Sequence, residues 1–437
     1  MNNPQVAPAD GKLGVLLVGL GAVSTTFIAG TMMIRKGNGL AGGSITQLAK
    51  IRVGRGKDKQ YKKVGEIVSM PDLKDLVFGA WDIFPDTAYE SAIHAEVLKP
   101  KHIEPVKDEL QAIKPMKAVF DHEYVSKLNG SNVKPQATRW EYVQELRKDI
   151  QNFKKENGVD RIVVVWAAST EKFIAYNPKT HDNLADLEAA MKADDRENIS
   201  PSMCYAYAAL AEDAPFVMGA PNLCVDIPAF WEMAEKNKLP IAGKDFKTGQ
   251  TLMKTVLAPM LRTRQLGLMG WFSTNILGNR DGEVLDAPEN FHTKEVSKLG
   301  VINTILRKED NADLYGDIFH KVRINYYPPR NDNKEGWDNL DIFGWMGKDY
   351  GMQIKVDFLC RDSILAAPLV LDLALNIDLA HRAGLVGTQR WLSFFLKSPM
   401  HDYTKGEEPV HDLFQQYIMY KNEIRTLGGY EADEEID

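Results

Sequence analysis

Two lysines four residues apart, Lys294 and Lys298, are of a type and spacing that could support chemistry. In a helix this spacing places both side chains on one face, where the two ammonium groups repel each other weakly. A structural interpretation pairs Lys294 with a neighbouring acid and leaves Lys298 in solvent. A functional interpretation places both cations around an anionic substrate, because a lysine near other cations or out of water has a lowered pKa and can move protons near neutral pH.

Two polar segments precede these lysines, Lys244–Thr251 and Asn275–Gly282, and both are dense in groups that bind phosphate or move protons. Asp362 and Lys397 follow at the edges of apolar stretches, where a helix cap or a side chain extending to solvent is the structural alternative. The sequence has no HExxH motif, no Walker lysine and no Ser/His/Asp order. The residue types therefore predict a lysine-rich pocket for an anion.

A glycine turn, Gly19–Ser24, stands directly after an apolar run expected to be a strand, Leu13–Val18, and opens a stretch expected to be a helix. Its glycines allow a tight turn and close approach of the backbone, and the N-terminus of the helix favours a pyrophosphate. Two features weaken the pattern: Ser24 replaces the third glycine, and no Asp or Glu that could bind a ribose occurs between the turn and Lys57. Nucleotide binding is the favoured interpretation, and a plain glycine turn is the alternative.

The 437 residues carry a net charge of −7, with 44% hydrophobic and 26% charged residues. This composition excludes a disordered or collagen-like chain. Most of the negative charge falls in the acidic segment 431–437, which we expect to be solvated, and nothing makes a basic field for nucleic acid. Three widely spaced cysteines, Cys204, Cys224 and Cys360, give no disulfide framework, so we expect buried thiols and a reducing, cytoplasmic location.

Residues 13–34 carry no charge and have the length of a membrane helix or a signal peptide. Gly19, Gly21 and the hydroxyl side chains of 24–26 interrupt this apolar run. A buried strand, a tight turn and a buried helix give the same hydropathy. We therefore expect no membrane role.

Apolar runs separated by helical stretches predict an α/β sheet that is covered on both faces. Arg161–Trp166 and Phe216–Gly219 are typical of its central parallel strands. Helices are expected at about 137–156, 184–193 and 203–212.

The pattern changes after about residue 265. Lys321–Tyr326 and Gln353–Phe358 alternate polar and apolar residues as half-exposed strands do, and a stretch rich in Pro, Asn, Asp and Lys, Pro328–Asn339, lies between them. We expect a mixed or antiparallel sheet over 265–360. Helices are expected again at 363–383, 387–396 and 409–426.

Nine strings in order, between about Gly14 and Gly428, resemble the myo-inositol-1-phosphate synthase family in its bacterial form. They are GSITQ (Gly43–Gln47), VFGAWDI (Val77–Ile83), WAASTE (Trp166–Glu171), ISPS (Ile199–Ser202), KDFKTGQT (Lys244–Thr251), LGNRDG (Leu277–Gly282), TKEVSK (Thr293–Lys298), CRDSILAAP (Cys360–Pro368) and FFLKSP (Phe394–Pro399).

The resemblance implies an activity. Enzymes of this family convert D-glucose 6-phosphate to 1L-myo-inositol 1-phosphate: NAD takes a hydride from C5, the 5-keto sugar enolises at C6, and an intramolecular aldol reaction with the C1 aldehyde closes the ring. The NADH then returns the hydride, so no net redox change occurs. A lysine ammonium in a dry site suits this chemistry because it stabilises the negative charge that develops on the C5 oxygen.

By this resemblance, Lys294, oriented by Asp245, is expected to stabilise the C5 oxygen and move its proton, and Lys397 to hold the C1 aldehyde oxygen with Asp362 nearby. The residues expected at the substrate phosphate are Lys298, Thr248, Gly249, Gln250 and Asn279. Those expected at NAD are Gly19, Gly21, Ala22, Val23 and Ser24 for the pyrophosphate, Asp82 and Ile83 for the adenosine side, and Ser169, Thr170 and Asp281 near the nicotinamide. Asp82 would replace the missing ribose acid.

Three positions depart from the family pattern. The segment 22–24 stands where members often have a run of asparagines, and Arg280 replaces a usual asparagine and adds a positive charge that we expect to face phosphate. Asn325, in Ile324-Asn325-Tyr326, stands where many members have an active-site lysine, so we expect it among the catalytic residues. Asparagine can hydrogen-bond an oxyanion but cannot neutralise or protonate it.

The expected fold is α/β. A Rossmann-type NAD-binding domain would comprise 1–251 together with 362–437, and an inserted α+β catalytic and oligomerisation domain would comprise 252–361. Family members are commonly tetramers through the inserted sheet, so a homotetramer is expected, and a need for a mono- or divalent cation stays open. Two other functions also stay open: a simple NAD-dependent sugar-phosphate dehydrogenase that releases NADH, and a nucleotide-binding sensor without chemistry.

Overall fold

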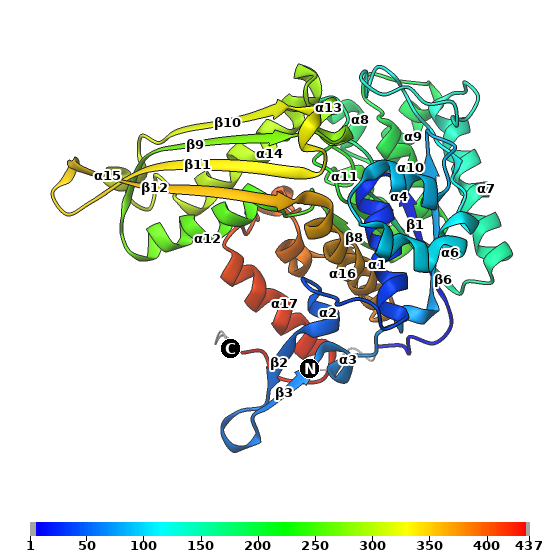
Figure 1. Cartoon of the computed structure of the whole chain (residues 1–437), viewed down its shortest axis with the longest axis horizontal. Coiled ribbons are helices and arrows are strands. Elements are labelled where there is room, and N and C mark those ends of the chain that lie inside the picture. Colours follow the sequence, from blue (N-terminus) through cyan, green and yellow to red (C-terminus); the bar gives the residue numbers. More distant parts are fainter. Residues whose placement is uncertain (1–5, 434–437) are drawn as a thin grey trace.

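The computed structural model describes residues 6–433, and a seven-stranded parallel sheet organises most of them (Figure 1). Its strand order is β13-β8-β7-β6-β1-β4-β5. The strands are β1 (Leu13–Val18), β4 (Leu76–Asp82), β5 (Met116–Lys117), β6 (Arg161–Trp166), β7 (Phe216–Met218), β8 (Pro240–Gly243) and β13 (Gly387–Thr388). The order reverses between β1 and β6, and in α/β sheets the crevice at such a point binds ligands.

Helices cover both faces of this sheet because successive residues of β1 point to opposite sides. Val15 and Leu17 pack into a core with α1 (Ala22–Arg35) and α16 (Asp362–Arg382). Leu16 and Val18 pack into a second core with helices of the other face. Those helices are α7 (Arg139–Asn157), α9 (Leu184–Lys192), α10 (Pro201–Ala211) and α11 (Pro228–Asn237). The predicted strands and helices of this part are confirmed to within a few residues.

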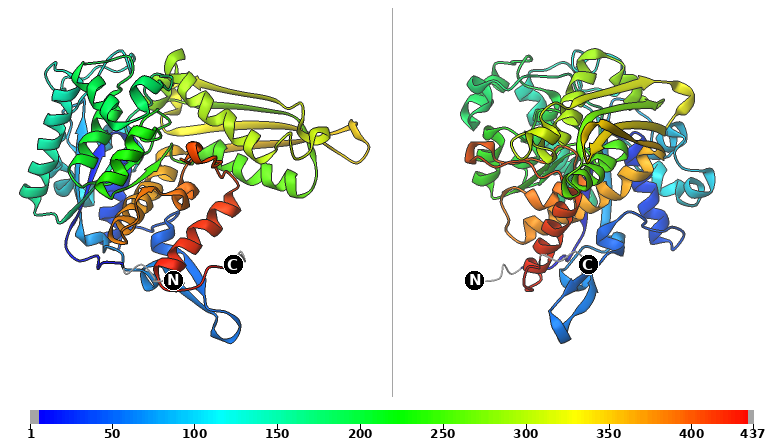
Figure 2. Two further views of the ribbon diagram at one scale, coloured as in Figure 1. Left: turned by 180° about the vertical axis from the view of Figure 1, so that it is seen from behind. Right: turned by 90° about the vertical axis from the view of Figure 1, so that its left-hand side faces the viewer.

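A second sheet extends from the rest of the molecule like an arm (Figures 1 and 2). Its order is β10-β9-β11-β12, with β9 and β10 parallel and the other pairs antiparallel, which confirms the expected mixed sheet. The strands are β9 (Gly267–Leu277), β10 (Phe319–Tyr326), β11 (Asn333–Gly344) and β12 (Gly347–Arg361). One face packs on α12 (Gly249–Thr263) and α14 (Pro288–Ile305) around Trp271, and the opposite face is largely exposed.

One helix of the second half of the chain was predicted wrongly. The helix predicted at 387–396 is strand β13 followed by a 3-10 helix, Arg390–Phe395, because Gly387 and Thr388 pair with the edge of β8. The stretch 328–339 contains the first half of β11. The last helix, α17 (Leu413–Leu427), begins later than predicted because the Asp412 side chain accepts from the N–H groups of Phe414 and Gln415 and caps it.

A small hairpin, β2 (Lys50–Val53) and β3 (Gln60–Lys63), lies in the chain between α1 and β4. Asp433, in the segment expected to be solvated, instead pairs with Arg52 of this hairpin, and 434–437 lie outside the described residues. The remaining short helices are α2 (Ile45–Leu48), α3 (Val64–Ile67), α4 (Ala88–Ala95), α5 (Pro100–Ile103), α6 (Lys107–Ala112), α8 (Pro178–His181), α13 (Arg280–Leu285) and α15 (Ala312–Tyr315).

The uncharged run 13–34 forms β1, the glycine turn and most of α1, as expected. Within residues 6–433, α16 alone has the length and hydropathy of a membrane span, and 72% of its most apolar window is buried inside the protein. A window buried to this extent fits a core helix. The three cysteines are free and buried, which confirms that prediction.

Candidate active site

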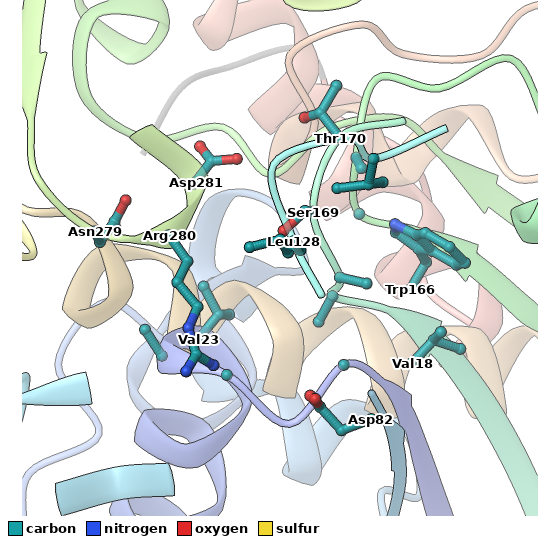
Figure 3. A pocket seen from close by; sticks show the side chains of 18 of the residues that line it. Val18, Val23, Asp82, Leu128, Trp166, Ser169, Thr170, Asn279, Arg280 and Asp281 are labelled. Carbon is teal, nitrogen blue, oxygen red and sulfur yellow. The ribbon is translucent and has the colours of Figure 1, made fainter. Parts of the chain in front are cut away.

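Residues from both sheets line a cavity of about 510 Å³ (Figure 3). It lies at the carboxyl ends of β1, β4 and β6 and reaches the loop after β8 and the starts of α13 and α16. Most of the predicted site residues line it: Gly19, Gly21, Ala22, Val23, Asp82, Ile83, Ser169, Thr170, Asp245, Thr248, Asn279, Asp281, Lys294, Asp362 and Lys397. The predicted residues that do not line it are Ser24, Gly249, Gln250, Lys298 and Asn325.

The glycine turn closes one end of the cavity. Gly19 has a φ of +95°, and a Cβ there would lie 2.8 Å from the Ala168 Cα, so the position requires glycine. A Cβ at Gly21 would meet nothing within 4 Å, which leaves a space that a ligand can approach closely. The hydroxyl of Ser24 donates to the Gly19 carbonyl oxygen at 2.6 Å, so Ser24 closes the turn from behind rather than lining the cavity.

Asp82, the acid expected at the adenosine ribose, lies at the carboxyl end of β4 and lines the cavity. In the sheet, β4 lies beside β1 on the side away from β6, where the second strand of a Rossmann unit belongs. The hairpin β2–β3 lengthens the connection from α1 to β4 and moves the acid far beyond its usual spacing. The Leu20 and Phe84 N–H groups donate to its two carboxylate oxygens at 2.5 and 2.9 Å, and each oxygen keeps a lone pair for a ligand.

Backbone pairing brings Asp245 and Lys397 together from distant parts of the chain. The segment after β8 pairs with residues 395–398: the Lys397 N–H donates to the Asp245 carbonyl oxygen at 2.7 Å, and Lys244 and Ser398 exchange two further bonds. Asp245 has a φ of +63°, which is uncommon for a residue other than glycine and marks a constrained position. The two side chains therefore enter the cavity side by side.

Asp245 forms ion pairs with two lysines, Lys294 and Lys397. The Lys294 Nζ lies 2.8 Å and the Lys397 Nζ 3.4 Å from Asp245 Oδ1, and all three side chains are buried. Burial alone would raise the pKa of Asp245, but the two ammonium groups outweigh it and lower that pKa. Burial lowers the pKa of Lys294, whereas Asp245 and Asp281 together raise it above its usual value. Lys294 is therefore held as an ammonium ion.

Lys397 differs from Lys294 although both contact Asp245. Burial lowers the pKa of Lys397 to about 8, because the attraction of Asp245 is offset by the nearby charges of Lys294 and Lys334. A group with this pKa can donate or accept a proton near neutral pH. Lys397 is thus suited to proton transfer and Lys294 to fixed charge.

Lys298 lies one helical turn after Lys294 on α14 and is 3% exposed. Its Nζ has no hydrogen-bond partner among the described residues, and burial together with Lys334 and Lys397 lowers its pKa well below the usual value. The expected shared face is confirmed, but the solvated alternative for Lys298 is not what the structure shows. A buried amine without a partner indicates that an anion completes the site.

The sequence reasoning missed a fourth lysine, Lys334. It lies near the start of β11 on the buried face, and its Nζ donates to Asp362 Oδ2 at 3.1 Å. Burial opposes the charge of Lys334, but Asp362 and Asp281 raise its pKa above the usual value. Asp332 lies beside this pair and accepts from the Ser363 N–H and hydroxyl, and burial and Asp362 raise its pKa to about 6.

The N-terminus of α12 faces the same cluster. Thr248 precedes it, and its hydroxyl donates to Asp362 Oδ1 at 2.8 Å instead of capping the helix. The first turn of α12 has no acid, so its free N–H groups favour an anion. The Gln250 amide donates to the carbonyl oxygens of Thr274 in β9 and Trp337 in β11, so its side chain holds the two strands beside the site.

Asn325 lies apart from this group. Odd-numbered residues of β10 point to the exposed face, and the Asn325 amide donates to Thr274 Oγ1 at 2.9 Å and to the Asn275 carbonyl oxygen at 3.2 Å. Because strand residues alternate between faces, its side chain is directed away from the helices that carry the lysines. The additional lysine of the buried cluster is Lys334 and does not come from position 325.

The sequence left open whether the protein needs a mono- or divalent cation. Between residues 6 and 433, no three His, Cys, Asp or Glu side chains are placed to hold a metal ion.

The cavity of about 510 Å³ fits a dinucleotide. Its wall includes the open space at Gly21, the uncapped helix N-terminus at Ala22 and the carboxylate of Asp82. Ser169 and Thr170, shortly after β6, and Asp281 also line the cavity, and the charge of Asp281 acts on Lys294 and Lys334.

The similarity to known proteins is extensive. Residues 13–425 match the sequence profile of the family described as "Myo-inositol-1-phosphate synthase". The chain is 63% identical over 426 residues to inositol-3-phosphate synthase 1 of Bacteroides thetaiotaomicron, with 97% of each chain covered. It is 32% identical to inositol-3-phosphate synthase of Candida glabrata, with 97% of this chain and 87% of that protein covered.

The fold is also similar to a solved structure. The crystal structure of inositol-3-phosphate synthase from Caenorhabditis elegans superposes with a TM-score of 0.91 at 26% identity, and the match covers 99% of this chain and 89% of that one. Sequence and fold agree over the whole region that builds the cavity. The chain therefore belongs to the myo-inositol-1-phosphate synthase family.

Proposed function

We propose that this protein converts D-glucose 6-phosphate to 1L-myo-inositol 1-phosphate and restores its NAD in every turnover. Family membership supports the overall reaction. The structural observation that carries the proposal is that a dinucleotide turn and a buried lysine cluster adjoin one cavity. Such a cavity can hold a coenzyme and an anionic sugar together, which a redox step without net change requires.

NAD would lie along the wall from the glycine turn to Thr170. Gly19, Gly21, Ala22 and Val23 would approach its pyrophosphate, with Ser24 supporting the turn, and Asp82 and Ile83 would face its adenosine side. When bound, NAD supplies a hydride acceptor and later the same hydride as NADH. Ser169, Thr170 and Asp281 would position the nicotinamide, because they line the cavity and Asp281 acts electrostatically on Lys294 and Lys334.

The substrate phosphate would bind at the N-terminus of α12. Lys298 supports this position, since its buried ammonium group lacks a partner among residues 6–433. Thr248, Gly249, Gln250 and Asn279 would surround the same anion, although the structure already uses the Gln250 amide to join β9 and β11. A dianionic phosphate would neutralise the excess positive charge of the lysine cluster.

Lys294 would stabilise the negative charge on the C5 oxygen during oxidation and enolisation. Its ammonium group is fixed by Asp245 and stays charged, so it acts as a preorganised cation in a site shielded from water. The Asp245 carboxylate, which accepts from the Lys294 Nζ at 2.8 Å, would orient this ammonium group toward the C5 oxygen.

Lys397 would hold the C1 aldehyde oxygen and donate a proton to it when the new carbon–carbon bond forms. Its pKa of about 8 fits a proton donor near neutral pH. Lys334 and Asp362 would keep a further charged pair beside this oxygen, because they form a buried ion pair next to Lys397. We thus assign to Lys334 the catalytic place that the sequence suggested for Asn325.

The test of this function compares two readouts in one reaction. The purified protein is incubated with glucose 6-phosphate and NAD while absorbance at 340 nm and inositol phosphate are both measured. Product without accumulating NADH supports the synthase. NADH formed in proportion to consumed sugar would support a simple dehydrogenase, and no reaction with retained NAD binding would support a sensor.

We further propose a homotetramer assembled through the exposed face of the four-stranded sheet. Phe272, Phe319, Trp337 and Leu359 lie on that face and are 37 to 66% exposed. Adjacent exposed apolar side chains of this size are typical of a protein–protein interface. The division into 1–251 with 362–437 and 252–361 belongs to this proposal, because each range contributes one of the two sheets.

A cytoplasmic location is also proposed. Its support is the set of three free, buried cysteines, which a reducing compartment preserves. The substrate is a phosphorylated metabolite that bears two negative charges, and the site is built for an anion.

A further inference from the structure

Arg280 is a charged residue of the cavity to which no role has yet been given. It is the first residue of α13, it lines the cavity, and its guanidinium carbon lies 4.0 Å from the centroid of the Phe84 ring. Figure 3 shows its side chain extended toward Val23 at the start of α1, whereas Asn279 and Asp281 point the opposite way. The guanidinium therefore faces the glycine turn and not the lysine cluster.

This guanidinium is available to a ligand. Within residues 6–433 it takes part in no ion pair and no side-chain hydrogen bond, and its recorded contact is with the Phe84 ring. Burial raises the pKa of Asp82, and the charge of Arg280 acts against that rise, but the two side chains form no ion pair or hydrogen bond. A permanently charged group that lines a cavity without a direct ion pair favours an anionic ligand.

The opposite wall of the cavity offers positive potential at the same place. The helix α1 has 14 residues, no side-chain cap and no acid in its first turn, so its first N–H groups are free to bind an anion. The space beside Gly21 is open. A diphosphate at this point would meet backbone N–H groups on one side and a guanidinium group on the other.

We propose that Arg280 binds the pyrophosphate of NAD and closes over it from the side of the four-stranded sheet. The inference rests on the coenzyme position proposed above. Guanidinium groups bind phosphate oxygens through paired hydrogen bonds, so the contact fixes orientation as well as charge. It suits a reaction in which the reduced coenzyme has to stay bound between two hydride transfers.

The test measures NADH binding to the full chain through NADH fluorescence, with ADP and adenosine as competitors. Arg280→Asn is expected to weaken binding of NADH and ADP by about 10- to 100-fold, because a charge-assisted hydrogen bond is lost, and to leave adenosine unchanged. Arg280→Lys keeps the charge but lacks the planar guanidinium group, so its affinity for NADH and ADP is expected to lie between those of the unmodified protein and Arg280→Asn. Arg264→Asn, an exposed arginine after α12 and outside the cavity, is the matched control and is expected to bind normally.

Three results would overturn the proposal. Unchanged NADH and ADP binding would remove Arg280 from the pyrophosphate, and equal weakening of ADP and adenosine would indicate a displaced turn. A loss confined to NADP, which differs by a 2′-phosphate, would place Arg280 at the ribose. A failure of the unmodified protein to bind NADH would instead contradict the proposed function, so the two failures are distinguishable.

Discussion

The protonation state of Lys397 makes the reaction sensitive to pH in a definite direction. Its pKa of about 8 reflects burial and neighbouring lysines, and the proposed role needs the protonated form. We therefore expect kcat to be constant below about pH 7 and to fall through pH 8 as the amine loses its proton. A pH–rate profile checks this, and a rate that rises through pH 8 would show that Lys397 acts as a base.

Substitutions of Lys334 and Asn325 test which of the two residues acts in catalysis with Lys294 and Lys397. Lys334→Ala is expected to lower kcat by about 10²- to 10³-fold, because a preorganised cation is removed from the site. Asn325→Ala is expected to change kcat by less than about threefold, since its exposed side chain bonds to β9 on the face directed away from the lysines, whereas the buried Lys334 pairs with Asp362 of the cavity wall. NADH binding by both variants serves as the control for folding, and the reverse ranking would return the role to position 325.

Most of the residues predicted for the site line one cavity, but the sequence analysis did not single out Lys334. Lys334 lies in a Pro-, Asn- and Asp-rich stretch that shows no apolar pattern, so its burial was not visible. A weak sequence signal lies further along the same strand, because the apolar Leu340 and Ile342 alternate with the polar Asn339 and Asp341 and share the buried face with Lys334. Pairing with Asp362 across β11 and β12 could not be predicted, since it depends on strand register.

At the scale of elements, the glycine turn has one position that tolerates no side chain. Gly19→Ala is expected to destabilise the protein by about 1–3 kcal/mol and to abolish NADH binding, because φ is +95° and the added Cβ would meet backbone at 2.8 Å. Gly30→Ala, inside α1 with open space around the Cβ, is the matched control. It is expected to stabilise by about 0.5–1 kcal/mol. Urea unfolding measures both, and equal effects would contradict this account of the turn.

Elements with strong periodicity could be predicted, and elements defined by pairing could not. The strands Leu13–Val18 and Arg161–Trp166 have the predicted bounds because continuous apolar runs mark buried parallel strands. The segment 387–396 was predicted as a helix from its apolar residues, but its start adds to the edge of β8. Asp82 was proposed for the ribose only by resemblance, because the inserted hairpin hides the spacing of a Rossmann unit.

At the scale of the whole molecule, the proposed homotetramer depends on the exposed face of the four-stranded sheet. Trp337→Lys is expected to convert the tetramer to smaller species, because a charge at the centre of an apolar interface leaves an unpaired ion. Light scattering after size-exclusion chromatography measures the mass. Lys348→Ala, in the exposed part of β12, is the control and should leave the mass unchanged. A chain that is monomeric without substitution would contradict the proposed homotetramer.

The central claim is that one hydride leaves C5 and returns to the same carbon without leaving the protein. The most direct measurement follows glucose 6-phosphate labelled with deuterium at C5 in a reaction with NAD, to which unlabelled NADH is added. The account predicts that the inositol phosphate keeps the deuterium at the carbon derived from C5. Product without the label, or deuterated NADH in solution, would contradict it.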